Sequence, residues 1–167
     1  IPEMLIGRLP AKDTLDVKNI TSKIIQYEKS DFGEENDFAS KSLMFAGVDA
    51  TYYKIMNGQI RYGVENYLLP ENNISEHHFY YPTVNKDSVI SLINSGLSFI
   101  NYTGHGSTTA LLNVNFNTSD TSKLNNSGRY PLLISNACQT SNFTVNSLGN
   151  TMVAAKNKGM IGYIGSS

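Results

Sequence analysis

Short apolar runs, each about as long as one β-strand, alternate along the chain with segments in which apolar residues recur at helical spacing. The apolar runs end at glycines or small polar residues and lie at 4–6, 42–48, 97–102, 130–135 and 160–164, with a shorter edge strand expected at 79–81. The helical segments lie at 13–27, 51–69, 86–95, 119–125 and 147–158. This alternation predicts right-handed crossovers and a mainly parallel sheet with helices on both faces, which is an α/β fold.

Capping residues indicate where two of these helices begin or end. Asp13 is placed to cap the first helix, in which apolar side chains from Val17 to Tyr27 recur on one face. Gly96 follows the third helix as a C-terminal stop. The polar, acidic stretch at 33–42 predicts a loop between the first helix and the second strand.

Composition excludes several classes of protein. Of the 167 residues, 40% are hydrophobic and 16% are charged, whereas disordered chains and coiled coils carry far more charge. The net charge of -1 offers no basic surface for a polyanion, so we expect no nucleic-acid partner. No apolar run approaches the ~20 residues that span a bilayer, so we expect a soluble chain without membrane insertion. We expect residues 1–167 to form a single domain or subdomain of a larger polypeptide, because the chain ends just after a core strand.

Three chemically active side chains follow the predicted core strands. Asp49 follows the strand at 42–48, and His105 follows the strand that ends near Tyr102. Cys138, the single cysteine, follows the strand that ends near Ser135. Because parallel strands bring their carboxyl ends to one edge of a sheet, we expect these three side chains to converge there.

A thiol, an imidazole and a carboxylate together are suited to nucleophilic catalysis. The Cys138 thiol reacts well only as a thiolate, and His105 can act as its base and can protonate a departing amine. Asp49 would then fix the tautomer of the imidazole. Gly104 and Gly106 permit close approach of a substrate, and the main-chain amides of Gly106 and Cys138 can stabilise an oxyanion.

Each of these residues also has an ordinary structural interpretation. A lone cysteine such as Cys138 is most often a small core residue. A histidine between glycines, such as His105, is commonly a turn residue, and Asp49 is placed to cap the helix that follows it. The combination favours catalysis, because both reactive groups follow apolar strands at the edge where a cysteine protease needs them.

Two motifs and their surroundings resemble the gingipain family of cysteine endopeptidases, which are relatives of the caspases. The motifs are Thr103-Gly104-His105-Gly106-Ser107, after Asn101-Tyr102, and Ser135-Asn136-Ala137-Cys138. The similarity extends over nearly the whole chain and includes Ile1-Pro2-Glu3, Ile6-Gly7-Arg8, Tyr27-Glu28 and the segment Gly159 to Ser166.

The resemblance implies a caspase-like three-layer α/β sandwich that hydrolyses peptide bonds, with peptide or protein substrates and no required cofactor. It assigns Cys138 as the nucleophile, His105 as the general acid and Asp49 as the acidic residue that orients the histidine. The residues that it places in the pocket for the side chain before the scissile bond are Thr103, Gly104 and Asn136. It also implies secretion or display at a bacterial cell surface. No acidic residue that would read a basic substrate side chain can be placed, so a preference for Arg or Lys is not predicted.

Metal binding is considered at two places in the sequence. Glu76, His77 and His78 are adjacent, but neighbouring histidines point in different directions on regular structure, so we predict no transition-metal site. An acidic group could hold a structural calcium ion, as in members of the resembled family, although a solvated loop is the favoured interpretation. Its members are Asp31, Glu34, Glu35 and Asp37.

Two other functions remain open at this point. A sortase-like surface transpeptidase would use the same Cys138 and His105 but would pass the acyl group to an amine instead of water. A non-catalytic binding module on the same fold would use neither. The sequence also leaves open whether the chain is active alone, its oligomeric state and its physiological substrate.

Overall fold

The computed structural model describes residues 7–30, 34–68 and 74–167. The helices are α1 (Thr14–Glu28), α2 (Tyr53–Tyr67), α3 (Lys86–Ser95) and α4 (Leu148–Ala154), with 3-10 helices η1 (Glu34–Ser40), η3 (Leu112–Val114) and η4 (Thr118–Lys123). The strands are β1 (Lys41–Ala46), β2 (Ser75–Phe79), β3 (Phe99–Thr103), β4 (Gly106–Ser107), β5 (Ala110–Leu111), β6 (Phe116–Asn117), β7 (Leu132–Asn136) and β8 (Gly162–Gly165).

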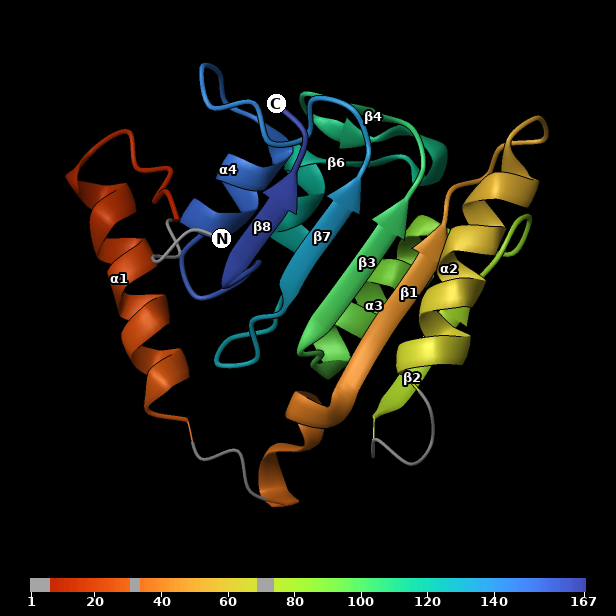
Figure 1. Cartoon of the computed structure of the whole chain (residues 1–167). Helices are drawn as coiled ribbons and strands as arrows, with labels where there is room; N and C mark the ends of the chain where they lie inside the picture. The colour runs from red at the N-terminus through yellow and green to blue at the C-terminus, as the bar shows by residue number, and fades with distance from the viewer. Residues whose placement is uncertain (1–6, 31–33, 69–73) are drawn as a thin grey trace, which may run out of the picture.

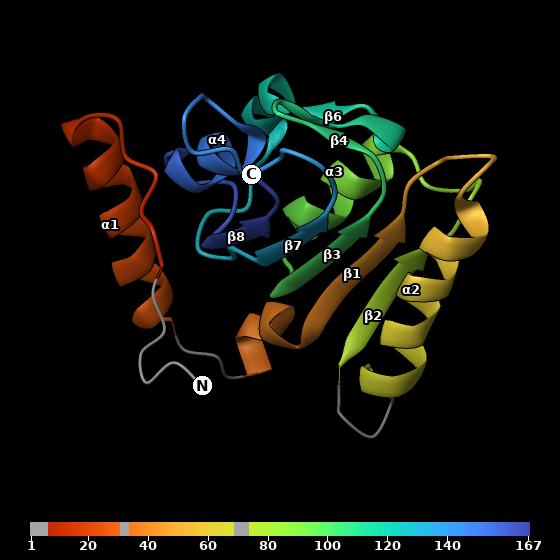
Figure 2. The same cartoon turned by 45° about the horizontal axis from the view of Figure 1, so that its top comes forward.

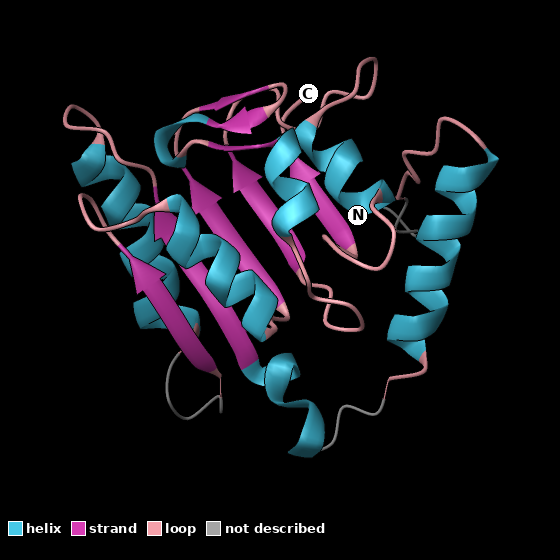
Figure 3. Ribbon diagram, turned by 180° about the vertical axis from the view of Figure 1, so that it is seen from behind, coloured by secondary structure: helices cyan, strands magenta, loops and turns pink. Residues whose placement is uncertain are grey.

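A five-stranded sheet in the order β2-β1-β3-β7-β8 forms the centre of the fold, and all of its pairings are parallel. Helix α2 covers one face, and α3 and α4 cover the opposite face, as the front and rear views show (Figures 1 and 3). This arrangement confirms the predicted α/β sandwich with a mainly parallel sheet.

Strand β1 shows how the two faces of the sheet are built. Its side chains alternate between faces, as in any strand. Leu43 and Phe45 join the main core together with residues of α3 and α4, whereas Met44 packs with Met56 and Ile60 of α2 in a smaller core cluster. A run that is apolar on both faces is typical of a central parallel strand, which explains why β1 reads as one continuous hydrophobic segment.

Several predicted elements agree closely with the structure. Helix α1 begins after Asp13, whose side chain accepts a hydrogen bond from the amide of Asp16, and α3 ends at Gly96, which has a φ of 97°. Helix α2 forms despite Gly58 and Gly63. The strand predicted at 4–6 lies outside the described residues.

Other predicted elements are wrong in position or type. The edge strand is β2, which runs parallel to β1. It spans Ser75–Phe79 instead of 79–81, so it contains His77 and His78. Part of the predicted loop at 33–42 is η1, and the predicted helix at 119–125 is the 3-10 helix η4. Helix α4 ends at Ala154 because Ala155 is already extended.

The polar segment after His105 forms a second, small sheet that the sequence did not predict. Its strands β4, β5 and β6 pair in antiparallel fashion. Figure 2 shows this small sheet above the carboxyl ends of β3 and β7. Each strand is two residues long, which is too short for a periodic pattern to reveal.

A buried lysine connects α1 to the rest of the fold. The Lys23 side chain is only 1% exposed, and its Nζ donates to the carbonyl oxygens of Met152 (3.3 Å), Lys158 (3.0 Å) and Met160 (2.8 Å). Val17, which was expected on the apolar face, is instead 49% exposed. Helix α1 is therefore anchored by one ammonium group as well as by Ile20.

In the part of the chain that the structure describes, none of the helices has the length and apolar character needed to cross a membrane.

Lys23 predicts a pH dependence of stability. Burial lowers the pKa of Lys23 from 10.5 to about 7, so the unfolded chain binds more protons than the folded chain between these two values. The free energy of unfolding should therefore rise across this window, by at most about 1.4 kcal/mol per pH unit. Urea unfolding at several pH values should show this rise in the wild type and lose it in Lys23→Met. Lys18→Met, at an exposed position of α1, should keep the wild-type slope. Equal slopes in all three proteins would contradict the assignment.

Candidate active site

The ends of three neighbouring strands lie in one row. In the parallel ladder, Ala46 of β1 is opposite Thr103 of β3, and Thr103 is opposite Asn136 of β7. Asp49 comes three residues after Ala46, and His105 and Cys138 each come two residues after their strand ends. The segments that follow β1, β3 and β7 therefore all begin at the same edge of the sheet, where the loops lie in Figure 1.

His105 and Asp49 are joined directly. His105 Nε2 lies 2.9 Å from Asp49 Oδ2. The other oxygen, Oδ1, accepts hydrogen bonds from the amides of Thr51 and Tyr52, both at 2.7 Å. The sequence suggested two roles for Asp49, as a cap of the following helix and as a partner of His105. In the structure Asp49 caps the turn that leads into α2, and it also contacts His105.

The state of the carboxylate determines the tautomer of the imidazole. The Tyr52 amide, with further contributions from the Thr51 amide and from His105, holds the pKa of Asp49 below its ordinary value despite an opposing effect of desolvation. An ionised carboxylate only accepts hydrogen bonds, so His105 Nε2 carries the proton of this bond. The other ring nitrogen, Nδ1, is the one left for a thiol or a substrate.

Cys138 is exposed and not a core residue. It lines an open groove with a volume of about 660 Å³, and the groove wall also includes Gly104, Asn136 and residues at the end of β8. The loops of Cys138 and His105 are in contact, because a Cβ added to Gly106 would come within 2.7 Å of the Cys138 carbonyl oxygen. The amides of Gly106 and Cys138 are thus on adjoining loops.

The three predicted pocket residues differ in their surroundings. Gly104 and Asn136 line the groove, and the amide of Gly104 donates to the Asn136 carbonyl oxygen at 3.2 Å. Asn136 Nδ2 also donates to Gln59 Oε1 of α2 at 2.9 Å. Thr103 is 5% exposed at the end of β3 and is not part of the groove lining.

Two residues near His105 were missed from the sequence. The Tyr52 ring meets the His105 ring edge-on, with 5.8 Å between centroids. Asn113, from η3, hydrogen-bonds to the main chain of both His105 and Val48. Tyr52 is close to Asp49 in sequence, which offered a weak signal, whereas nothing in the polar segment around Asn113 distinguished it from its neighbours.

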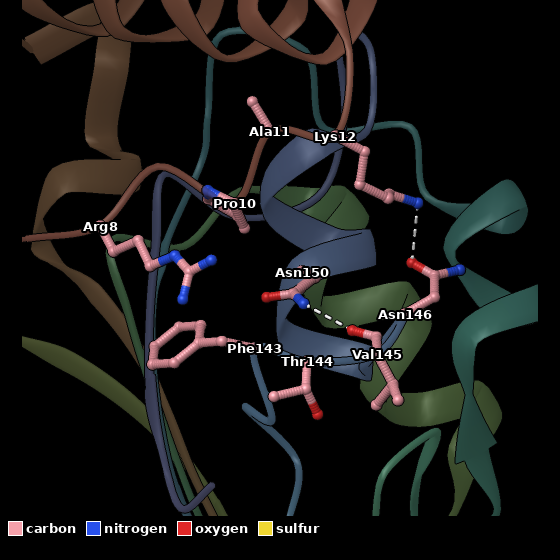
Figure 4. Close-up of a pocket in the computed structure, with 9 residues that line it drawn as sticks. All are labelled: Arg8, Pro10, Ala11, Lys12, Phe143, Thr144, Val145, Asn146 and Asn150. Carbon is pink, nitrogen blue, oxygen red and sulfur yellow. Dashed lines mark hydrogen bonds between the residues drawn. The ribbon is translucent and has the colours of Figure 1, made fainter.

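A second cavity, of about 190 Å³, lies between the segment before α1 and the loop before α4 (Figure 4). The Arg8 guanidinium lies 4.6 Å from the centre of the Phe143 ring there, and Lys12 Nζ donates to Asn146 Oδ1 at 3.1 Å. None of the predicted site residues lines it.

Within the described ranges, no three His, Cys, Asp or Glu side chains are grouped so that they could hold a metal ion. His78 Nδ1 lies 2.7 Å from Glu76 Oε2 on β2. Of the acidic group considered for calcium, Asp31 lies outside the described residues, and Asp37 forms an ion pair with Lys41 at 2.5 Å.

Comparisons with known proteins identify the family of the chain. The family model of peptidase family C25 matches residues 1–167. Lys-gingipain from Porphyromonas gingivalis is 32% identical over 169 residues, which cover 99% of this chain and 10% of Lys-gingipain. This chain thus spans about a tenth of that relative's length.

Two solved structures share the fold. The Arg-specific cysteine proteinase gingipain R has a TM-score of 0.80 and 23% identity, with 93% of this chain and 38% of that chain covered. A complex of the pro- and mature domains of RgpB from Porphyromonas gingivalis gives a TM-score of 0.81 and 26% identity, with coverage of 98% and 40%. Since the family model covers the full length of the sequence, the chain belongs to peptidase family C25.

Proposed function

We propose that this chain carries the catalytic residues of a cysteine endopeptidase, with Cys138 as nucleophile, His105 as general acid and base, and Asp49 as the residue that orients His105. The observation that carries the proposal is the hydrogen bond of 2.9 Å between His105 and Asp49, on a loop that adjoins the loop of Cys138, which is exposed in an open groove. Family membership supports the same chemistry.

The proposed reaction assigns one step to each reactive group. The Cys138 thiolate attacks the substrate carbonyl carbon, and the thiol proton is held on His105 Nδ1. The amides of Gly106 and Cys138 donate to the oxyanion, and the C–N bond breaks as His105 gives its proton to the departing amine. His105 then takes a proton from water, whose oxygen attacks the thioester and releases Cys138. Besides water, these steps use side chains and main-chain amides and call for no cofactor.

The groove determines which substrate side chain precedes the scissile bond. We assign Gly104 and Asn136 to its wall and Thr103 to the supporting strand end. The described lining is uncharged, so it offers no carboxylate that would select Lys or Arg.

Longer relatives suggest the kind of protein to which residues 1–167 belong. We propose that residues 1–167 are one catalytic subdomain of a longer bacterial peptidase that is secreted or held at the cell surface. The support is that Lys-gingipain extends well beyond the matched region and that a similar structure contains separate pro- and mature domains. A calcium ion, if present, would be structural and not part of the chemistry.

The first test is replacement of the nucleophile. In the protein expressed at its natural length, Cys138→Ala should abolish cleavage of a peptide library with varied residues before the scissile bond, because residues 1–167 hold no other thiol that could form the thioester. Val145→Ala, at an exposed position outside the groove, should leave the rate within about twofold. Cleavage by Cys138→Ala at the wild-type rate would refute the proposal. Products joined to an added amine instead of water would identify a transpeptidase.

The second test separates an activated thiol from an ordinary one. Iodoacetamide at pH 6 should alkylate Cys138 faster than it alkylates a small-molecule thiol, because a neighbouring imidazolium stabilises the thiolate. His105→Ala should reduce the labelling rate to that of the small-molecule thiol, as followed by mass spectrometry. Identical labelling of wild type and His105→Ala would favour the binding-module alternative.

The third test concerns Asp49. Asp49→Ala should retain a residual rate, with kcat lowered roughly 100-fold, because the nucleophile survives when the orienting group is lost. Thermal unfolding should be measured alongside, since Asp49 also caps the turn into α2. Asp49→Asn keeps an acceptor for the Thr51 and Tyr52 amides, so it should recover stability more than it recovers kcat. Recovery of both to the same extent would assign Asp49 a structural role only.

A further inference from the structure

The contact between His105 and Asp49 lies past the end of the backbone hydrogen bonds that join β1 to β3. The loop of Asp49 follows β1, and the loop of His105 follows β3. The last backbone hydrogen bond between these two segments runs from the Gly47 amide to the Thr103 carbonyl oxygen, at 2.8 Å. Asp49 and His105 each lie two residues further along. The distance between the two side chains therefore depends on contacts other than the parallel ladder.

Asn113 supplies such contacts. Its Oδ1 accepts a hydrogen bond from the His105 amide at 2.5 Å, and its Nδ2 donates to the Val48 carbonyl oxygen at 3.0 Å. The Val48 amide also donates to the Asn113 carbonyl oxygen at 3.3 Å. An amide side chain is both donor and acceptor, and these partners fix which end faces which loop.

The small sheet fixes Asn113 and His105 relative to each other. The Leu112 amide donates to the His105 carbonyl oxygen at 3.0 Å. The Tyr102 hydroxyl donates to the same oxygen at 2.9 Å, and burial raises the pKa of Tyr102, so this hydroxyl stays protonated. Both main-chain polar groups of His105 therefore have partners, one of which is Asn113.

Two glycines make room for this arrangement. A Cβ added to Gly47 would come within 2.5 Å of Asn113 Cβ, and one added to Gly104 would lie 3.0 Å from Asn113 Oδ1 and would collide with the Tyr102 hydroxyl. The close approach of the loops thus requires glycine at both positions.

We propose that Asn113 is a positioning residue that connects the loop of Asp49 to the loop of His105 and thereby sets the geometry of their hydrogen bond. The inference rests on the proposed function, which gives this bond its role. Asn113 acts through His105 and does not contact the reacting atoms. Its effect on activity should therefore require Asp49 to be present.

A double-mutant cycle tests this dependence in the protein of natural length. Asn113→Ala should lower kcat by roughly 10- to 100-fold and leave KM within about threefold, because the loss is one of orientation. In an Asp49→Ala background the same change should cost less than about threefold, since the bond that Asn113 positions is already missing. Equal losses in the two backgrounds would overturn the proposal.

Asn126 provides a matched control. It also ties two loops together, through Nδ2 to the carbonyl oxygens of Arg129 (3.0 Å) and Gly159 (2.8 Å) and through Oδ1 to the Gly159 amide (2.9 Å). These loops precede β7 and β8, at the opposite edge of the sheet from the site. Asn126→Ala should lower the melting temperature while kcat per folded molecule stays within about twofold. A kcat loss equal to that of Asn113→Ala would show that Asn113 acts through stability.

A measurement without substrate separates the two proposals. Hydrogen exchange at the His105 amide should be faster in Asn113→Ala than in the wild type, because its acceptor is removed. Unchanged exchange would overturn the positioning role even if Cys138→Ala is inactive. Suppose instead that exchange is faster and the Cys138→Ala protein is active. The hydrogen bond from the His105 amide to Asn113 would then be confirmed, and the proposed cysteine peptidase function would be refuted.

Discussion

Parallel pairing of β1, β3 and β7 in register is the constraint on which the rest of the structure depends. Ala46, Thr103 and Asn136 form one row, so the residues that follow them start from a common line. Strand β1 is buried on both faces, and β3 and β7 each bury the side chains of one face, which makes a slip in register costly. The core therefore determines the alignment of three loops that are far apart in the sequence.

Beyond this row, mostly neutral hydrogen bonds shape the site. Main-chain amides hold Asp49, and an asparagine and a tyrosine hydroxyl hold the main chain of His105. The charged group of the pair is the Asp49 carboxylate, which contacts His105. The neutral groups hold the Asp49 side chain and the His105 main chain in place without adding a further charge beside the imidazole.

Sequence patterns were sufficient where local physics dominates. The apolar runs located the core strands, and the caps at Asp13 and Gly96 located helix ends, because these signals come from the residues themselves. The small sheet, the exact position of β2 and the anchoring by Lys23 were not predictable, since each depends on partners distant in sequence. Asp49, His105 and Cys138 could be proposed from strand ends alone, but Asn113 could not.

The connection between β6 and β7, residues 118–131, returns the chain to the amino end of β7. The last part of this connection, with the buried Asn126 and Tyr130, meets β7 at the edge remote from Cys138. By contrast, one residue gained or lost between Asn136 and Cys138 would displace the sulfur by a distance comparable to the ~3.8 Å between consecutive Cα atoms. The number of residues between the end of β7 and Cys138 is therefore a length on which the site depends directly.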